Sequence, residues 1–219
     1  MIASCVAFTA FSCFYAAQTT FAQEIVLNKT FYFLIANGDN AQACLALTYQ
    51  YGGAGYALNR DGNEYAVYAC YNDEKEAENA SETLLKNGRK AFILPQRCGA
   101  VYLRTRAQKA RKNEISGWLV TLEDCTEALS FSIDGAESGN MSQSALKSAA
   151  KSVESVLRSL CKSVSSDTDK PIKRCAESCA EYSKELSDIA ESVVFARDLR
   201  RVHAGMCDEY IRLASAYAL

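Results

Sequence analysis

Charge of either sign is missing from the first 22 residues, MIASCVAFTAFSCFYAAQTTFA, while every Lys, Arg, Asp and Glu lies beyond them. We expect residues 1–22 to be a secretory signal cleaved after Ala22 or a membrane anchor, because the run is apolar and long enough to span a bilayer. No basic residue precedes it, and Cys5 ends a lipobox-like stretch, so we expect the true start codon further upstream. The alternative is a buried N-terminal helix.

Net charge and histidine are also scarce. Lys and Arg number 24 against 26 Asp and Glu, which gives a formal net charge of −2 at pH 7. This near balance excludes the global basic field that draws a protein to nucleic acid or to an anionic membrane surface. The single histidine, His203, has no nucleophile motif near it. We therefore expect it on the surface of a helix, and we expect no catalytic site.

A second close pair of cysteines is missing too, although the chain has ten cysteines. Only Cys175 and Cys179 are close, four positions apart on one face of a predicted helix. A zinc site needs about four ligands, and this pair has no companions, so we expect no metal site and no cofactor. The cysteines beyond residue 22 are candidates for disulfides outside the cytoplasm or for small apolar side chains on helix faces.

Two stretches share one order of elements. Both FYFLIANGDNAQACLALTYQYGGAGYAL (31–58) and YAVYACYNDEKEAENASETLLKNGRKAFIL (65–94) begin with aromatic and β-branched residues, which strands favour. A polar entry, a helical segment, a glycine stop and a second strand follow in each. We expect strands at 30–36, 55–58, 65–71 and 91–94.

Turn signals join these two halves into one domain. Asn72-Asp73-Glu74 predicts the start of the second helix, and Asp61-Gly62 predicts a hairpin between the halves. The result is an α+β fold over about residues 29–95, a ferredoxin-like βαββαβ sandwich with two helices on one face of a four-stranded sheet. We expect the other face of the sheet to be open.

The stretch YAVYACYNDEKEAENASETLLKNGRKAFIL resembles the second half of the SPOR domain, a family of bacterial cell-envelope proteins, in its Tyr-x-Val strand, Glu-Ala helix and glycine stop. The resemblance covers about residues 30–95 and implies binding to the glycan strands of peptidoglycan through the open sheet face, with links to cell division or sporulation. The chain departs from the family at Leu34 and Ala36, where a Gln and a Gly are usual, and at Cys70-Tyr71 in place of Gly-Pro-Phe.

The strand alternation indicates which side chains reach the ligand. Successive residues of a strand point to opposite faces, so one set packs under the helices and the other is outward. We expect the inward set to be Phe31, Phe33, Ile35, Tyr65, Val67 and Ala69. The candidate glycan-binding residues are Tyr32, Leu34, Tyr56, Arg60 and Tyr68. Tyrosine rings stack on sugars and Arg offers planar donors, although strand tyrosines also serve as plain packing residues.

RNA-binding modules share this element order, but the strand EYAVYA lacks their basic-Gly-aromatic core and the next helix is acidic, so we expect no nucleic acid partner.

The rest of the chain is predicted to be mostly helical. Residues 96–141 are expected to form a basic linker and a short helix near 118–129. The linker is either solvated or a contact for an anionic polymer, because residues 97–112 hold six basic and no acidic side chains. Residues 142–219 are expected to form a helical hairpin or small bundle, because apolar stripes of helical period run through 142–165 and 172–202.

These features predict an exported envelope protein that binds peptidoglycan glycan strands without catalysis. The rival hypothesis is a protein-interaction scaffold that has lost glycan binding and whose C-terminal helices engage an envelope partner. An open, polar sheet face favours the first hypothesis. An apolar face occupied by other elements, with Leu34 buried under the C-terminal helices, favours the second.

Overall fold

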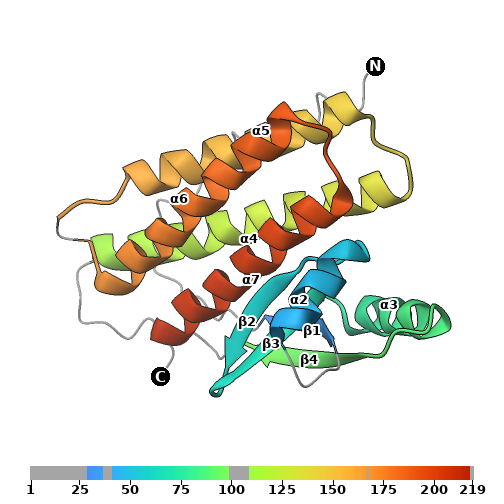
Figure 1. The fold of residues 1–219 in the computed structure, drawn as a ribbon. Coiled ribbons are helices and arrows are strands. Elements are labelled where there is room, and N and C mark those ends of the chain that lie inside the picture. Colours follow the sequence, from blue (N-terminus) through green and yellow to red (C-terminus); the bar gives the residue numbers. More distant parts are fainter. Residues whose placement is uncertain (1–28, 37–40, 99–108, 167, 218–219) are drawn as a thin grey trace.

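The computed structural model describes residues 29–36, 41–98, 109–166 and 168–217. Figure 1 shows a four-stranded sheet with two helices of its own beside a bundle of four longer helices. The expected signal or anchor segment, 1–22, lies outside the described residues. Within the described residues, no helix combines the length and the apolar character needed to cross a membrane.

The sheet is antiparallel throughout, with the strand order β2-β3-β1-β4. This confirms the predicted α+β class. The predicted hairpin joins β2 to β3, where Asp61 and Gly62 have φ values of 51° and 78°. Such positive values at both central positions match the right-handed twist of a hairpin. The strands are β1 (Thr30–Ala36), β2 (Tyr56–Arg60), β3 (Asn63–Tyr71) and β4 (Ala91–Arg97).

Two short helices cover one face of the sheet. Helix α2 (Ala41–Gln50) packs on β2 and β3, and α3 (Glu74–Lys86) packs on β1, β3 and β4. The α3 helix begins where the sequence predicts, because the carboxylate of Asp73 accepts a hydrogen bond from the backbone N–H of Glu76 at 3.0 Å. The polar entry to α2, residues 37–40, lies outside the described residues.

The C-terminal region is a four-helix bundle. Helix α4 contacts α5 and α7, and α6 contacts α5 and α7, so neighbours along the chain are neighbours in space. The start of α6 follows its predicted signal, because Pro171 occupies the first turn. The helices are α4 (Lys109–Glu137), α5 (Gln143–Lys162), α6 (Lys170–Glu191) and α7 (Ala196–Tyr217).

Two expectations for this region are wrong. The short helix predicted near 118–129 is part of the 29-residue helix α4, because helical propensity continues on both sides of its apolar core. The single stripe predicted for 172–202 is divided between α6 and α7, and the chain breaks at residues 192–195. Three of the four residues there, Val193, Val194 and Phe195, are β-branched or aromatic and thus poor helix formers.

The helices of the bundle approach closely at one glycine. A Cβ atom at Gly205 of α7 would collide with the ring of Tyr182 on α6, at 2.6 Å from its Cζ atom. The absence of a side chain at Gly205 therefore lets the aromatic ring lie against the α7 backbone. This contact brings α7 close to α6.

Candidate functional site

Helix α7 lies on the sheet face opposite α2 and α3 (Figure 1). The ring centroids of Phe31 on β1 and Tyr210 on α7 are 5.4 Å apart in an edge-to-face arrangement, and both side chains are fully buried. Phe33, Ile35 and Val67 belong to the same apolar cluster as the bundle residues. The face of the sheet that carries this set is therefore packed against the C-terminal helices.

The predicted assignment of the two faces is consequently wrong. Phe31, Phe33 and Ile35 were expected under the short helices, but they meet α7. Leu34 points the other way by alternation, and it is 1% exposed beneath α2 and α3 rather than beneath the C-terminal helices. The reason is that β1 is apolar on both faces, as in strands covered from both sides, so its pattern cannot distinguish one cover from the other.

A β-bulge in β3 is a second reason why the predicted assignment of side chains to the two faces is wrong. Leu34 pairs with Ala69 and Ile35 pairs with Val67, so Tyr68 has no partner residue in β1. The bulge shifts the alternation by one residue, which moves Ala69 to the face of α2 and α3. Tyr68 lies against Gly53, where a Cβ atom would be 2.8 Å from its ring. This tyrosine is packed under the end of α2.

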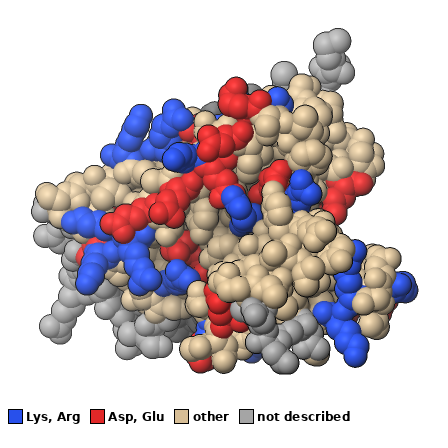
Figure 2. All heavy atoms as spheres, in the orientation of Figure 1, with Lys and Arg blue, Asp and Glu red and all other residues tan. Residues whose placement is uncertain are grey.

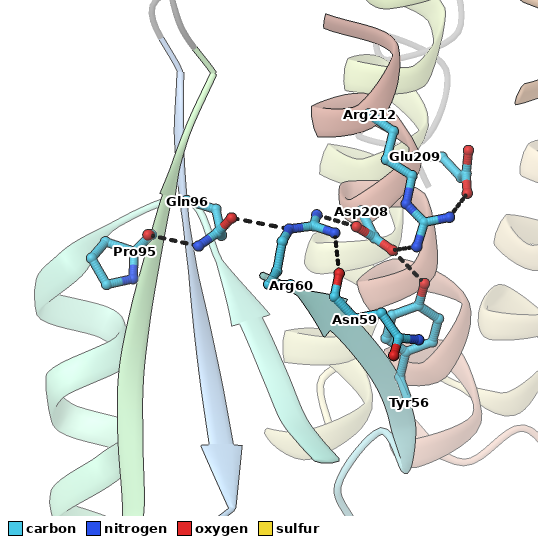
Figure 3. A network of polar contacts seen from close by, with 8 residues as sticks. All are labelled: Tyr56, Asn59, Arg60, Pro95, Gln96, Asp208, Glu209 and Arg212. Carbon is cyan, nitrogen blue, oxygen red and sulfur yellow. Dashed lines mark hydrogen bonds and ion pairs between the residues drawn. The ribbon is translucent and has the colours of Figure 1, made fainter. Parts of the chain in front are cut away.

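Asp208 of α7 is the centre of a polar network on the covered face (Figure 3). Its carboxylate is fully buried and accepts a hydrogen bond from the Tyr56 hydroxyl at 2.8 Å. It also pairs with Arg60 of β2 and with Arg212, the latter at 2.7 Å. Arg60 donates from Nε to Gln96 on β4 at 3.0 Å, so the guanidinium group crosses the sheet face.

The polar groups of Tyr56 and Arg60, which were expected to bind a sugar, are already bonded within this network. Burial, and then the neighbouring Tyr182 and Asp208, raise the pKa of Tyr56 far above its ordinary value, so its hydroxyl stays protonated and donates. Of the five predicted glycan-binding residues, Tyr56 and Arg60 thus face α7, whereas Tyr32, Leu34 and Tyr68 belong to the opposite face. The structure does not bring the five together.

A second buried cluster lies between β3 and α7. His203, predicted on the surface, is 2% exposed, and its Nε2 is 3.6 Å from the Sγ of Cys207. The expectation fails because α7 is surrounded by α4, α6 and the sheet. Cys207 is fully buried, and Cys70 on β3 is 5% exposed. Both thiols belong to the common apolar cluster.

A hollow in the described surface lies elsewhere, in a groove of about 440 Å³ built by α2, α6 and α7. Two interactions connect the helices that form the groove. The Tyr49 hydroxyl of α2 donates to Asp198 of α7 at 2.6 Å, and Arg201 of α7 pairs with Glu185 of α6. Figure 2 shows acidic side chains gathered in a band over α6, with basic side chains on both sides. The lining residues are Tyr49, Glu181, Lys184, Glu185, Asp188, Ile189, Ser192, Asp198 and Arg201.

The charges of the groove are only partly satisfied. Four carboxylates and two basic groups line it. Glu181, Lys184 and Asp188 form no hydrogen bond or ion pair with any described residue. Ser192 lines the groove, and Val193 and Phe195, which follow it in the α6–α7 connection, are exposed. The combination of unpaired carboxylates and exposed apolar groups suits a basic segment with apolar side chains.

Sequence reasoning missed both the network and the groove. Only the apolar stripe of α6 was considered, but Glu181, Lys184 and Asp188 recur at spacings of three and four and so share a helix face. That spacing is a readable signal. Asp208 gave no comparable signal, because charged residues are seldom fully buried and its partners in β2 are about 150 positions away.

Comparisons with known proteins add no relatives. No protein-family model, no curated protein and no solved structure matches the chain. Among the described residues there is also no group of three or more His, Cys, Asp or Glu side chains placed to hold a metal ion.

Proposed function

We propose that the protein is a non-catalytic interaction protein of the bacterial cell envelope, in which a SPOR-like sandwich is merged with a helical bundle that binds a protein partner. The observation that carries this proposal is the position of α7 on the sheet. It buries Phe31 and occupies Arg60, so we place the partner instead in the groove of α2, α6 and α7.

The finer fold supports the envelope assignment. The element order β1-α2-β2-β3-α3-β4, with strand order β2-β3-β1-β4, is that of the ferredoxin-like split βαβ sandwich. This is the arrangement that the resemblance to SPOR domains implies. The resemblance also implies that the ligand binds the sheet face opposite the two short helices. In this chain, however, α7 covers that face. We propose that the chain keeps a SPOR-like fold but uses a different surface for binding, as a scaffold does.

The partner we propose is a protein segment that is basic and partly apolar. Glu181 and Asp188 attract basic side chains, while Val193 and Phe195, which follow the groove residue Ser192 in the chain, are exposed and offer apolar contact. A ten-residue peptide of alternating lysine and leucine is a suitable probe. We expect it to bind the folded chain in a fluorescence anisotropy titration, with an affinity that falls as salt is added.

Reversing the two unpaired carboxylates tests the site. The double variant Glu181→Lys/Asp188→Lys is expected to bind the lysine–leucine peptide roughly tenfold more weakly, because each exposed charge contributes about 0.7 kcal/mol. The matched control is Glu78→Lys/Glu82→Lys on the exposed face of α3, which changes the net charge equally. We expect the control to retain the affinity of the unchanged chain within about twofold.

Two results would count against this proposal. One is equal affinity for the lysine–leucine peptide and for its glutamate–leucine counterpart, since the groove then contributes no charge selectivity. The other is an equal loss of affinity in the α3 control, which would show that only the overall charge of the protein matters.

Glycan binding is the second candidate function. One part of the covered face is not shielded by α7, because Phe92 on the edge strand β4 is 54% exposed and pairs with Ile35 on that same face. An exposed aromatic ring of this kind can stack on a sugar. In this chain a glycan strand would therefore meet β4 rather than the centre of the sheet.

A further inference from the structure

The walls of the groove are helical. Eight of its nine lining residues lie within α2, α6 or α7. The ninth, Ser192, follows the last residue of α6, and its backbone N–H already donates to the carbonyl oxygen of Ile189 at 3.2 Å. None of the lining residues belongs to a strand. A bound segment therefore finds no row of free backbone groups in this groove.

This geometry restricts the backbone conformation of a partner. An extended peptide binds by adding to an exposed sheet edge, which pairs with its backbone N–H and C=O groups. The groove offers no such edge, and backbone groups that are buried without partners cost free energy. A helix pairs its own backbone groups internally and presents only side chains. A helical segment can thus enter the groove without that cost.

Three charges of α6 that have no described partner repeat at a helical spacing. Glu181, Lys184 and Asp188 are exposed, lie three and four positions apart, and form one stripe along the groove. Glu181 and Asp188 are two turns apart, which is roughly 10 Å along the helix axis. A second helix that packs alongside α6 repeats its side chains with the same period. Two of its lysines, two turns apart, reach both carboxylates, and a glutamate between them reaches Lys184.

Aromatic rings lie beside this charged stripe. Tyr49 lines the groove, and Phe195 is 50% exposed. The guanidinium group of Arg197 lies 5.0 Å from the centroid of each ring, so Phe195 is close to the wall that Tyr49 forms. A helix that meets the charges of α6 with one stripe can place apolar side chains of the neighbouring stripe against these rings.

We propose that the partner of the groove is an amphipathic α-helix. One of its stripes carries Lys, Glu and Lys in register with Glu181, Lys184 and Asp188, and the neighbouring stripe is apolar. This inference rests on the proposed function, because it specifies the conformation and the charge pattern of the segment that the groove binds.

Three peptides of identical composition, each about 15 residues long, test the conformation. The first has the proposed Lys-Glu-Lys stripe beside a leucine stripe. The second is also helical in period but has its lysines on opposite faces, and the third alternates leucine with polar residues in the period of a strand. In fluorescence anisotropy titrations of the folded chain, we expect the first to bind about tenfold more tightly than either of the others. Circular dichroism should show that it gains helix on binding.

A charge exchange tests the register at Lys184. We expect Lys184→Glu to weaken binding of the first peptide roughly threefold, because a glutamate then faces a glutamate. Replacing the central glutamate of the peptide with lysine should restore the affinity within about twofold. The control is Lys86→Glu in the last turn of α3, which is also exposed and changes the net charge equally. This variant should keep the preference for the central glutamate.

Equal affinities for the first and third peptides would overturn this inference, and so would binding without a gain of helix. An exchanged peptide that fails to restore binding to Lys184→Glu would also overturn it. The proposed function survives these results if the chain still prefers the alternating lysine–leucine peptide to its glutamate–leucine counterpart. Loss of that preference would overturn both.

Discussion

Replacing Asp208 with alanine is expected to lower the free energy of unfolding by about 3–5 kcal/mol. The carboxylate is fully buried, and its removal leaves the Tyr56 hydroxyl and the Arg60 guanidinium without their main acceptor. A buried charge that loses its partner costs far more than an exposed ion pair contributes. Because Arg60 lies on β2 and Asp208 on α7, the substitution weakens the contact between the sheet and the bundle.

Urea unfolding followed by circular dichroism measures this effect. Asp188→Ala is the control, since this carboxylate is exposed on α6 and has no described partner, and we expect its effect to stay within about 0.5 kcal/mol. If Asp208→Ala changes stability as little as Asp188→Ala does, the network does not hold α7 on the sheet.

Tyr210→Ala is expected to cost about 3–5 kcal/mol, whereas Tyr210→Phe should cost nothing or stabilise the fold by about 1 kcal/mol. The ring is fully buried against Phe31, so truncation leaves a cavity beneath α7. The hydroxyl group is buried without a hydrogen-bond partner among the described residues. Removing it keeps the ring contact and relieves an unpaired polar atom.

The same urea experiment separates these two variants. A loss of more than about 1 kcal/mol in Tyr210→Phe would mean that the hydroxyl makes a hydrogen bond. A loss below about 1 kcal/mol in Tyr210→Ala would mean that α7 does not pack on β1 as described.

Local chemistry made much of the sandwich predictable. The Asp61-Gly62 turn, the Asp73 cap and the glycine stops depend on neighbouring residues, so they are visible in the sequence. Pro171 marked the start of α6 for the same reason. These signals were enough to predict two βαβ halves and a helical region after them.

The placement of the layers was not predictable in the same way. Phe33 and Leu34 are both apolar, so alternation showed two buried faces but not which helices cover each. The bulge at Tyr68 has no sequence signal of its own. The burial of His203 and Asp208 depends on residues of the sandwich far away in the chain, and a helical pattern alone carries no information about them.

We propose that α7 closes the sheet face and leaves partner binding to the helices. Co-sedimentation of the folded chain with peptidoglycan sacculi, before and after an amidase removes the stem peptides, tests it most directly. We predict that the chain stays in the supernatant with both preparations, since Tyr56 and Arg60 are held by Asp208. Co-sedimentation that rises after amidase treatment and disappears in a folded Phe92→Ala variant would contradict the account and establish glycan binding at β4.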